Sequence, residues 1–165
     1  MDFFSKPVGV LKPEDLEALA RSGIDENQTL EFKSALPNHE LNNDPWVKDR
    51  KINDAAKFEV LKRLVAFANA DGGWFIIGLA EPSDGGTYAD RLHPLPEPGD
   101  LANRLQQLAS ERIDPPLSVV SIEPVLTDEG ADEGVVVMRS PRSRRAPHAV
   151  KGGTEDELLP AVARA

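Results

Sequence analysis

Cysteine is absent from this chain of 165 residues. Without thiols, the chain can form no disulfide, no thiolate metal site and no cysteine nucleophile, and the absence is compatible with a reducing compartment. Aromatic residues make up only 5% of the sequence, so the core must consist mainly of Leu, Val, Ile and Ala. The sequence has no secretory leader pattern and no run approaching the roughly 20 apolar residues that a membrane helix needs. We therefore expect a soluble, cytoplasmic protein.

The motifs of several common enzyme classes are missing as well. There is no G-x-x-x-x-G-K-[ST] loop for nucleotide phosphates and no G-x-G-x-x-G turn for dinucleotides. The histidines at 39, 93 and 148 lack metal-ligand spacing, and no serine lies in a G-x-S-x-G turn. These absences exclude the usual forms of those sites.

A formal net charge of −9 argues against a protein that coats nucleic acid by charge alone. The acidity is regional, however, because nearly every charge between Glu81 and Glu133 is acidic, whereas the stretch from Arg139 to Lys151 has five basic residues and no acid. A second basic group, mixed with acids, precedes and enters the central helix; its members are Lys48, Arg50, Lys51, Lys57, Lys62 and Arg63. A basic face is therefore compatible with the acidic total.

The hydrophobic pattern predicts three helices and four strands. The expected helices cover 13–22, 53–69 and 98–112, and the expected strands 28–33, 74–79, 117–123 and 134–139. Because helices and strands do not alternate regularly, we expect a two-layer α+β domain, with helices on one side of a mixed, largely antiparallel sheet. This domain should span residues 1–151, and the tail over 152–165 is weakly patterned.

The stretch FANADGGWFIIGLAE, residues 67–81, passes from a helix into a strand without a linker. Gly72 and Gly73 permit the left-handed backbone of a helix end and a tight turn. The apolar run from Trp74 to Leu79 predicts a central strand covered on both faces. Trp74 is thus expected in the core, and Trp46, in a polar segment, is the better candidate for stacking on a base.

Three glutamates lie on or near the predicted strands: Glu26, Glu31 and Glu81. If strands 28–33 and 74–79 are neighbours, these carboxylates could converge at one edge, where a divalent cation such as Mg²⁺ or Mn²⁺ would neutralise them. Such a cation could orient water and stabilise charge on a phosphate. The alternative is that they are ordinary solvated acids in a chain with 28 Asp and Glu residues.

A basic segment, Arg142-Ser-Arg144-Arg145, stands close before Pro147-His148. Guanidinium groups bind phosphate oxygens in pairs and a serine can add a hydrogen bond, so the segment is a candidate for phosphate contact. The alternative is a solvated basic loop.

Several motifs occur in a characteristic order. They are Glu26-Asn-Gln-Thr-Leu-Glu31-Phe-Lys33, then Val65-Ala-Phe-Ala-Asn-Ala-Asp-Gly-Gly73-Trp-Phe-Ile-Ile-Gly78-Leu, an I-x-P-P element at 113–116, and Pro147-His148. Together they resemble the Schlafen-type AlbA_2 domain, once described as a divergent AAA domain or a DNA-binding domain.

The resemblance implies residue roles. In nuclease members of the family, two glutamates of the first motif and an acid after the later strand form a metal-assisted site that cleaves tRNA-like RNA. By position these are Glu26, Glu31 and Glu81, with Mg²⁺ or Mn²⁺ as the cofactor, and Lys33 matches a lysine that could contact phosphate. The other expected nucleic-acid contacts are Lys48, Arg50, Lys51, Arg142, Arg144, Arg145 and His148.

The sequence departs from the family pattern in three places. Ala80-Glu81 replaces the usual acidic pair, the 34–53 segment looks longer than the usual connection, and the chain ends without the tyrosine-rich strand of most bacterial members. The resemblance implies either a homodimer, because Schlafen nuclease cores have two such lobes facing a channel, or a partner chain that completes the sheet. Sedimentation as a monomer at micromolar concentration would count against the dimer.

Three functions are compatible with these features. The first is a metal-dependent endoribonuclease acting on structured RNA, more than on DNA. The second is a non-catalytic nucleic-acid-binding or transcription-regulatory module, although no helix-turn-helix follows the domain. The third is ATP binding, implied only by the old family description and disfavoured by the missing phosphate loop. Nucleic-acid binding is the part common to the first two.

Overall fold

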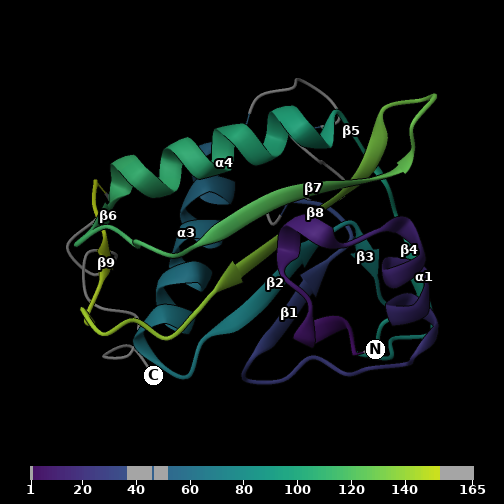
Figure 1. The fold of residues 1–165 in the computed structure, drawn as a ribbon, viewed down its shortest axis with the longest axis horizontal. Coiled ribbons are helices and arrows are strands. Elements are labelled where there is room, and N and C mark those ends of the chain that lie inside the picture. The colour runs from purple at the N-terminus through teal and green to yellow at the C-terminus, as the bar shows by residue number, and fades with distance from the viewer. Residues whose placement is uncertain (1, 37–45, 47–51, 153–165) are drawn as a thin grey trace.

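A five-stranded sheet forms the centre of the computed structural model, which describes residues 2–36, 46 and 52–152. β1 (Leu30–Lys33) runs parallel to β2 (Gly73–Ile77), and β2 is antiparallel to β8 (Glu133–Ser140). The two other strands of the sheet, β7 (Ser121–Asp128) and β5 (Leu95–Pro96), are also antiparallel to β8. Two short pairs complete the strands (Figure 1): β3 (Leu79–Ala80) with β4 (Arg91–Leu92), and β6 (Ile113–Asp114) with β9 (Ala149–Val150).

The two long helices, α3 (Asp54–Asn69) and α4 (Pro98–Arg112), pack on one face of the sheet. Alternate residues of β2 divide between two cores, because Phe75 and Ile77 face these helices while Trp74 and Ile76 face away from them. The predicted α+β class and mostly antiparallel sheet, with the long helices on one side, are confirmed. No helix in the described residues is long and apolar enough to cross a membrane.

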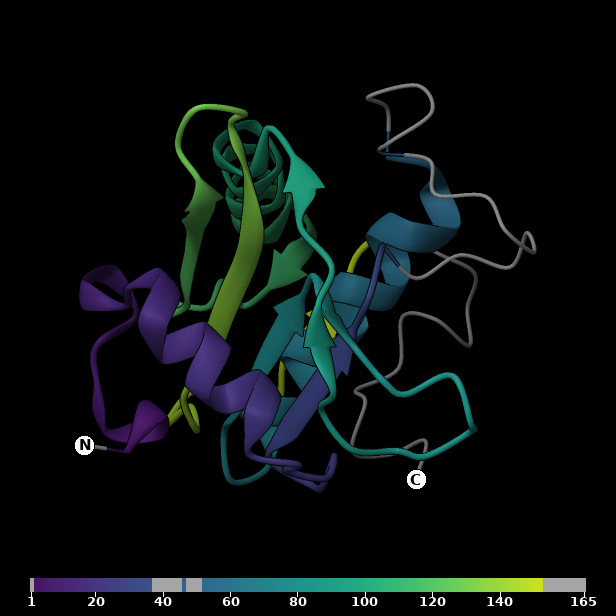
Figure 2. The same cartoon turned by 90° about the vertical axis from the view of Figure 1, so that its right-hand side faces the viewer.

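An amino-terminal segment covers the second core. It consists of two short 3₁₀ turns, η1 (Phe3–Ser5) and η2 (Val8–Val10), and of helix α1 (Pro13–Arg21). Their apolar side chains pack against Trp74 and the other residues of that core. Figure 2 shows α1 and α3 on opposite sides of the strands.

Two predicted strands differ from the observed ones. The expected strand at 74–79 is interrupted at Gly78, whose φ of 109° ends β2 and starts β3. The expected strand at 117–123 is shifted to 121–128, because pairing with β8 buries Ile122 and Val125 and leaves Val119 61% exposed. The local hydrophobic pattern predicted a strand at 117–123, whereas hydrogen bonding to β8 places the strand at 121–128.

The helix-to-strand turn at 69–73 needs both of its glycines. Gly72 has a φ of 84°, and its N–H donates to the carbonyl of Phe67 at 2.8 Å. A Cβ atom at Gly72 would lie 2.8 Å from the backbone nitrogen of Arg142, and one at Gly73 would overlap the Phe67 ring. The backbone of a distant segment is therefore packed directly against the turn.

Replacing Gly72 with Ala should destabilise the fold by about 2 kcal/mol or more, because it adds both a left-handed backbone penalty and a clash with backbone atoms. Thermal or urea denaturation measures the change. Gly99→Ala is the matched control, since Gly99 lies in the first turn of α4 and a Cβ there meets nothing within 4 Å. Equal stability of the two variants would contradict this account of the turn.

Candidate functional site

Glu26 caps the outer edge of the sheet. The carbonyls of Thr29 and Lys33 accept hydrogen bonds from Trp74 of β2 and from Gly78 just after it, so the amide of Phe32 points away from β2. The Oε1 atom of Glu26 accepts this amide hydrogen bond at 3.1 Å. The carboxylate thus occupies the place of a carbonyl from a further strand.

Glu31 lies on the opposite side of β1 from Leu30 and Phe32, toward α3. Its carboxylate pairs with Lys33 at 3.3 Å and with Arg63 of α3 at 3.7 Å, and its side chain is 14% exposed. Lys33, predicted to contact phosphate, is therefore engaged by its neighbour in this structure.

Glu81 follows β3 and is exposed. It lines a hollow of about 380 Å³ at the end of β1, together with Lys33, Arg91 and His93. Arg91 donates to the Glu81 carbonyl at 3.0 Å and also pairs with Asp90. The hollow therefore combines one carboxylate with cationic and imidazole groups.

Glu31 and Glu81 both lie within electrostatic range of Glu26. The pKa of Glu26 is raised above its ordinary 4.5, first by desolvation and further by repulsion from Glu31 and Glu81; the Phe32 hydrogen bond and Lys33 oppose the rise. The convergence of the three glutamates at one metal-binding edge stays a prediction. Across residues 2–36, 46 and 52–152, however, no three His, Cys, Asp or Glu side chains form a group that could hold a metal ion.

The basic segment closes the carboxyl end of α3. We refer to residues 141–148 as the arginine loop. Just before it, Ser140 Oγ donates to the Leu64 carbonyl at 2.9 Å, and within it Ser143 N donates to the Ala68 carbonyl at 2.9 Å. The Asn69 amide then binds the backbone of His148 twice, accepting from its N–H at 2.7 Å and donating to its carbonyl at 3.0 Å. These bonds fix the loop to the helix.

His148 does not reach the surface, which corrects its predicted contact with nucleic acid. Its side chain is fully buried. Nδ1 donates to the carbonyl of Pro115, which can only accept, and Nε2 lies 2.6 Å from the hydroxyl of Ser143. His148 is therefore a positioning residue that holds the arginine loop. Asn69 belongs to the motif at 65–79 and His148 to the Pro147-His148 motif. The occurrence of both motifs in the sequence was the available signal for this contact.

The arginines around this loop have no acidic partners among the described residues. Arg139, Arg142, Arg144 and Arg145, here called the arginine cluster, are exposed, and none pairs with a carboxylate of the described residues. By contrast, Arg21, Arg63, Arg91 and Arg104 each form a salt bridge. The cluster lies beside the carboxyl end of α3, whose dipole favours positive charge. Lys48, Arg50 and Lys51 lie outside the described residues.

The acids and the arginine cluster occupy different places. Arg142 lies beside Gly72 at the start of β2, and Glu81 follows β3 beyond its end. The five residues of β2 alone span about 13 Å at the usual strand rise. The structure therefore does not bring the three glutamates and the arginine loop into one pocket.

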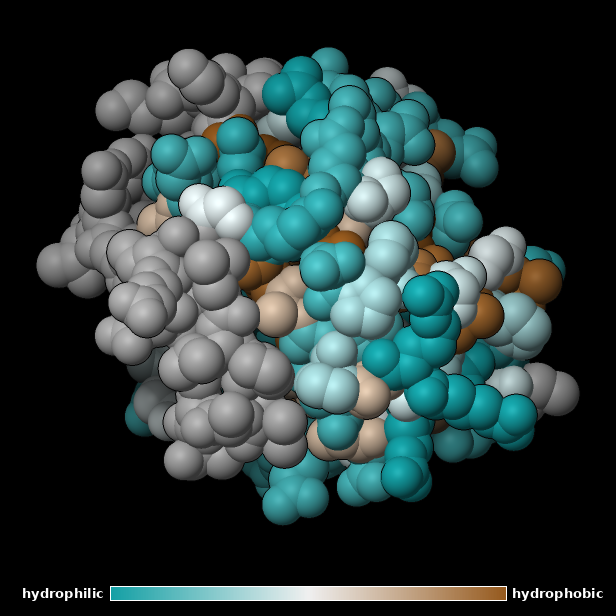
Figure 3. All heavy atoms as spheres, turned by 90° about the vertical axis from the view of Figure 1, so that its left-hand side faces the viewer, coloured by the Kyte–Doolittle hydropathy of each residue, from teal (hydrophilic) through white to brown (hydrophobic). Residues whose placement is uncertain are grey.

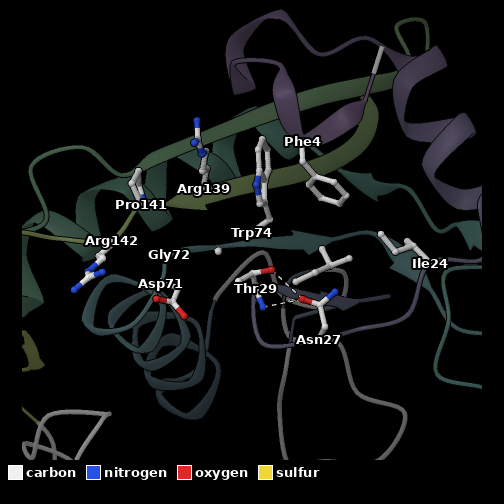
Figure 4. A pocket seen from close by; sticks show the side chains of 12 residues that line it. Phe4, Ile24, Asn27, Thr29, Asp71, Gly72, Trp74, Arg139, Pro141 and Arg142 are labelled. Atoms are coloured by element: carbon white, nitrogen blue, oxygen red, sulfur yellow. Dashed lines mark hydrogen bonds between the residues drawn. The ribbon is translucent and has the colours of Figure 1, made fainter.

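Of the two tryptophans, Trp46 departs from its expected role. Trp46 is fully buried, and its indole N–H donates to the carbonyl of Pro96 at 2.7 Å, so it offers no stacking surface. Trp74 belongs to a core, as predicted, but it also lines a hollow of about 470 Å³ with Arg139 and Arg142 (Figure 4).

The end of the molecule that carries β6 and β9 is shown in Figure 3, where hydrophobic atoms of the described residues form only small, separate patches.

Comparisons with known proteins give two findings. The model of a family described as "Schlafen, AlbA_2" matches residues 26–156. The solved N-terminal domain of a RecG-related protein from Nitrosomonas europaea, described as an ATP-dependent DNA helicase relative, has a similar fold, with a TM-score of 0.56 and 19% identity. The match covers 92% of this chain and 85% of that domain. No curated protein sequence matches this chain.

Glu26→Gln should raise the melting temperature at pH 7 by a small amount, on the order of 1–2 °C. The pKa of Glu26 is higher in the folded state, so the stability gained from its neutral form is complete below pH 4.5 and is lost as pH rises through the raised pKa. Gln is neutral at every pH and can still accept from Phe32. The gain should therefore vanish below pH 4.5.

Melting curves from pH 4 to 8 test this prediction. Glu17→Gln is the control, because Glu17 is an exposed acid of α1. A lower melting temperature of Glu26→Gln at pH 7 would show that the charge itself stabilises the fold.

Proposed function

This chain belongs to the Schlafen AlbA_2 family, and on that premise we propose that it binds nucleic acid, RNA in preference to DNA, through the arginine cluster. The observation that carries the proposal is the pairing of charges. In a chain of net charge −9, Arg139, Arg142, Arg144 and Arg145 have no carboxylate partner within the described ranges, whereas most other described arginines have one. Unpaired guanidinium groups gathered at one end favour a ligand with several phosphates.

The anchoring of the loop supports phosphate binding. Asn69, His148 and Ser143 fix the loop backbone to α3, so less conformational freedom is lost when phosphates bind. The hydroxyl of Ser143 is occupied by His148 and by the N–H of Arg145, which leaves the guanidinium groups as the main phosphate donors. The acidic remainder of the surface repels phosphates and directs them to this end.

The comparison with a DNA-helicase-related domain is compatible with this function. That domain resembles this chain in fold. A dimer of two chains facing each other, which the family resemblance implies, would present two such clusters to one nucleic acid.

Replacing Arg144 and Arg145 with Gln should weaken binding of single-stranded RNA about tenfold at 0.1 M salt and reduce the slope of log affinity against log salt by about 1.4, since each lost phosphate contact removes about 0.7. Fluorescence anisotropy with labelled RNA at several salt concentrations gives both values. The control is Lys12→Gln with Arg21→Gln, which removes the same charge from the two ends of α1, on the side of the molecule away from the loop (Figure 1). Equal losses in the two double variants would refute binding through the cluster.

A second candidate function is metal-dependent cleavage of structured RNA, with Mg²⁺ or Mn²⁺ held by Glu26, Glu31 and Glu81. The pKa of Glu26, raised first by desolvation and further by repulsion from the other two, is compatible with it. Carboxylate oxygens suit these cations, which would supply charge stabilisation at a phosphate. As arranged, however, the three do not form a metal-holding group, because Glu26 binds Phe32 and Glu31 binds Lys33 and Arg63. Coordination by all three requires these contacts to be exchanged.

Cleavage of labelled tRNA, assayed with Mn²⁺, Mg²⁺ or EDTA, tests the second candidate. If it is correct, Glu31→Gln abolishes metal-dependent cleavage but keeps RNA binding, because the substitution removes a carboxylate and leaves the arginine cluster intact. Glu17→Gln, in α1, should cleave normally. Absence of cleavage by the unmodified protein with either metal would reject this candidate without affecting the binding proposal.

A further inference from the structure

The hollow beside Trp74, here called the Trp74 hollow, lies between the start of β2 and the amino-terminal segment. Its volume of about 470 Å³ falls in the ~300–1,000 Å³ range of small-molecule sites. Figure 4 shows Trp74 standing between Arg139 and Phe4, with Asp71, Gly72, Thr29 and Asn27 below them and Arg142 to one side. The hollow thus lies next to the arginine cluster.

One wall of the hollow is suited to a flat ring. The Phe4 ring is 5.5 Å from that of Trp74, and the guanidinium of Arg139 lies over the Trp74 ring at 5.4 Å. Arg139 is exposed and has no carboxylate partner in the described ranges, so its planar guanidinium can move away from the Trp74 ring. A nucleobase has the shape to replace the guanidinium on the indole, and Arg139 is then free to bind a phosphate.

The opposite side of the hollow offers polar groups of two kinds. The carboxylate of Asp71 is a hydrogen-bond acceptor, and no partner binds it in the part of the chain that the structure describes. The side-chain oxygen of Asn27 is occupied by the N–H and hydroxyl of Thr29, while its amide nitrogen makes one long contact of 3.4 Å. The lining of the hollow therefore includes an acceptor without a partner among the described residues and, separately, an amide donor with only one long contact.

We propose that the Trp74 hollow binds one unpaired nucleobase with an exocyclic amino group, adenine, cytosine or guanine, while Arg139 and Arg142 hold the adjoining phosphates. This inference rests on the proposed function and adds the part of the ligand that is recognised. The amino group donates to Asp71, whereas uracil has no amino group and offers on the same edge only its ring N3–H, which stands between two carbonyl oxygens that the carboxylate repels. A paired base cannot enter, because its polar edge and both faces are already occupied.

The experiment compares a short oligoadenylate with an oligouridylate of equal length, using anisotropy for affinity and intrinsic tryptophan fluorescence for the site. Only two tryptophans are present, and Trp46 is fully buried, so a base at the hollow is reported by Trp74. Oligoadenylate should bind about tenfold more tightly than oligouridylate and should quench the fluorescence more strongly.

Asp71→Ala separates recognition from charge. Asp71 is exposed, so the variant should fold, and loss of a negative charge near the phosphates should strengthen binding of oligouridylate. The ratio of the two affinities should fall to about one. Glu129→Ala, in the exposed turn between β7 and β8, removes the same charge at the far end of β8 from Arg139 and should keep the ratio.

The outcomes distinguish the two proposals. Equal, salt-dependent binding of both oligonucleotides without tryptophan quenching would overturn the base site and leave nucleic-acid binding in place. An adenylate preference that persists in Asp71→Ala would also overturn it. Binding of neither oligonucleotide would reject the proposed function together with the base site.

Discussion

The positions of β2 and of the arginine loop both depend on how the carboxyl end of α3 is closed. The last carbonyls of a helix have no partners within the helix. Here the chain turns at once into β2 through Gly72 and Gly73, and a distant segment supplies one missing donor, the Ser143 amide, to the Ala68 carbonyl. Ser140 Oγ adds a hydrogen bond to the Leu64 carbonyl, and the backbone of His148 binds the Asn69 side chain. One set of hydrogen bonds therefore closes the helix, fixes the start of the central strand and sets the position of the arginine loop.

That arrangement also separates the charges of the molecule. Basic groups on the helices and at the end of β1 are neutralised by nearby acids, as Arg63 and Lys33 are by Glu31. The arginines next to the closed helix end form no salt bridge with an acid of the described residues, although Asp71 lines the same hollow, and the helix dipole compensates part of their mutual repulsion. A strongly acidic protein can thus present a cationic end without being basic as a whole.

The sequence predicted elements whose signals are local. The helix at 98–112 matched its observed bounds, and α3 begins after the cap Asn53, which accepts from the Ala56 amide at 2.8 Å. Features that depend on distant partners were missed. Nothing near Trp46 shows that Pro96 will accept its hydrogen bond, and nothing near His148 shows that Asn69, 79 residues away, will bury it. The expected approach of the three glutamates required strands β1 and β2 to be neighbours, and they are. The salt bridges of Glu31 were not predicted.

The outer edge of β1 has a consequence for association. An edge strand normally offers free amides to a strand of another molecule. At this edge Asn27 binds the amide of Leu30 and Glu26 binds that of Phe32, both from the turn just before the strand. An incoming strand would have to displace a partly desolvated negative charge to gain a single hydrogen bond. The chain thereby protects its own sheet from growing at β1, which limits fibre-like aggregation and directs any assembly of copies to other surfaces.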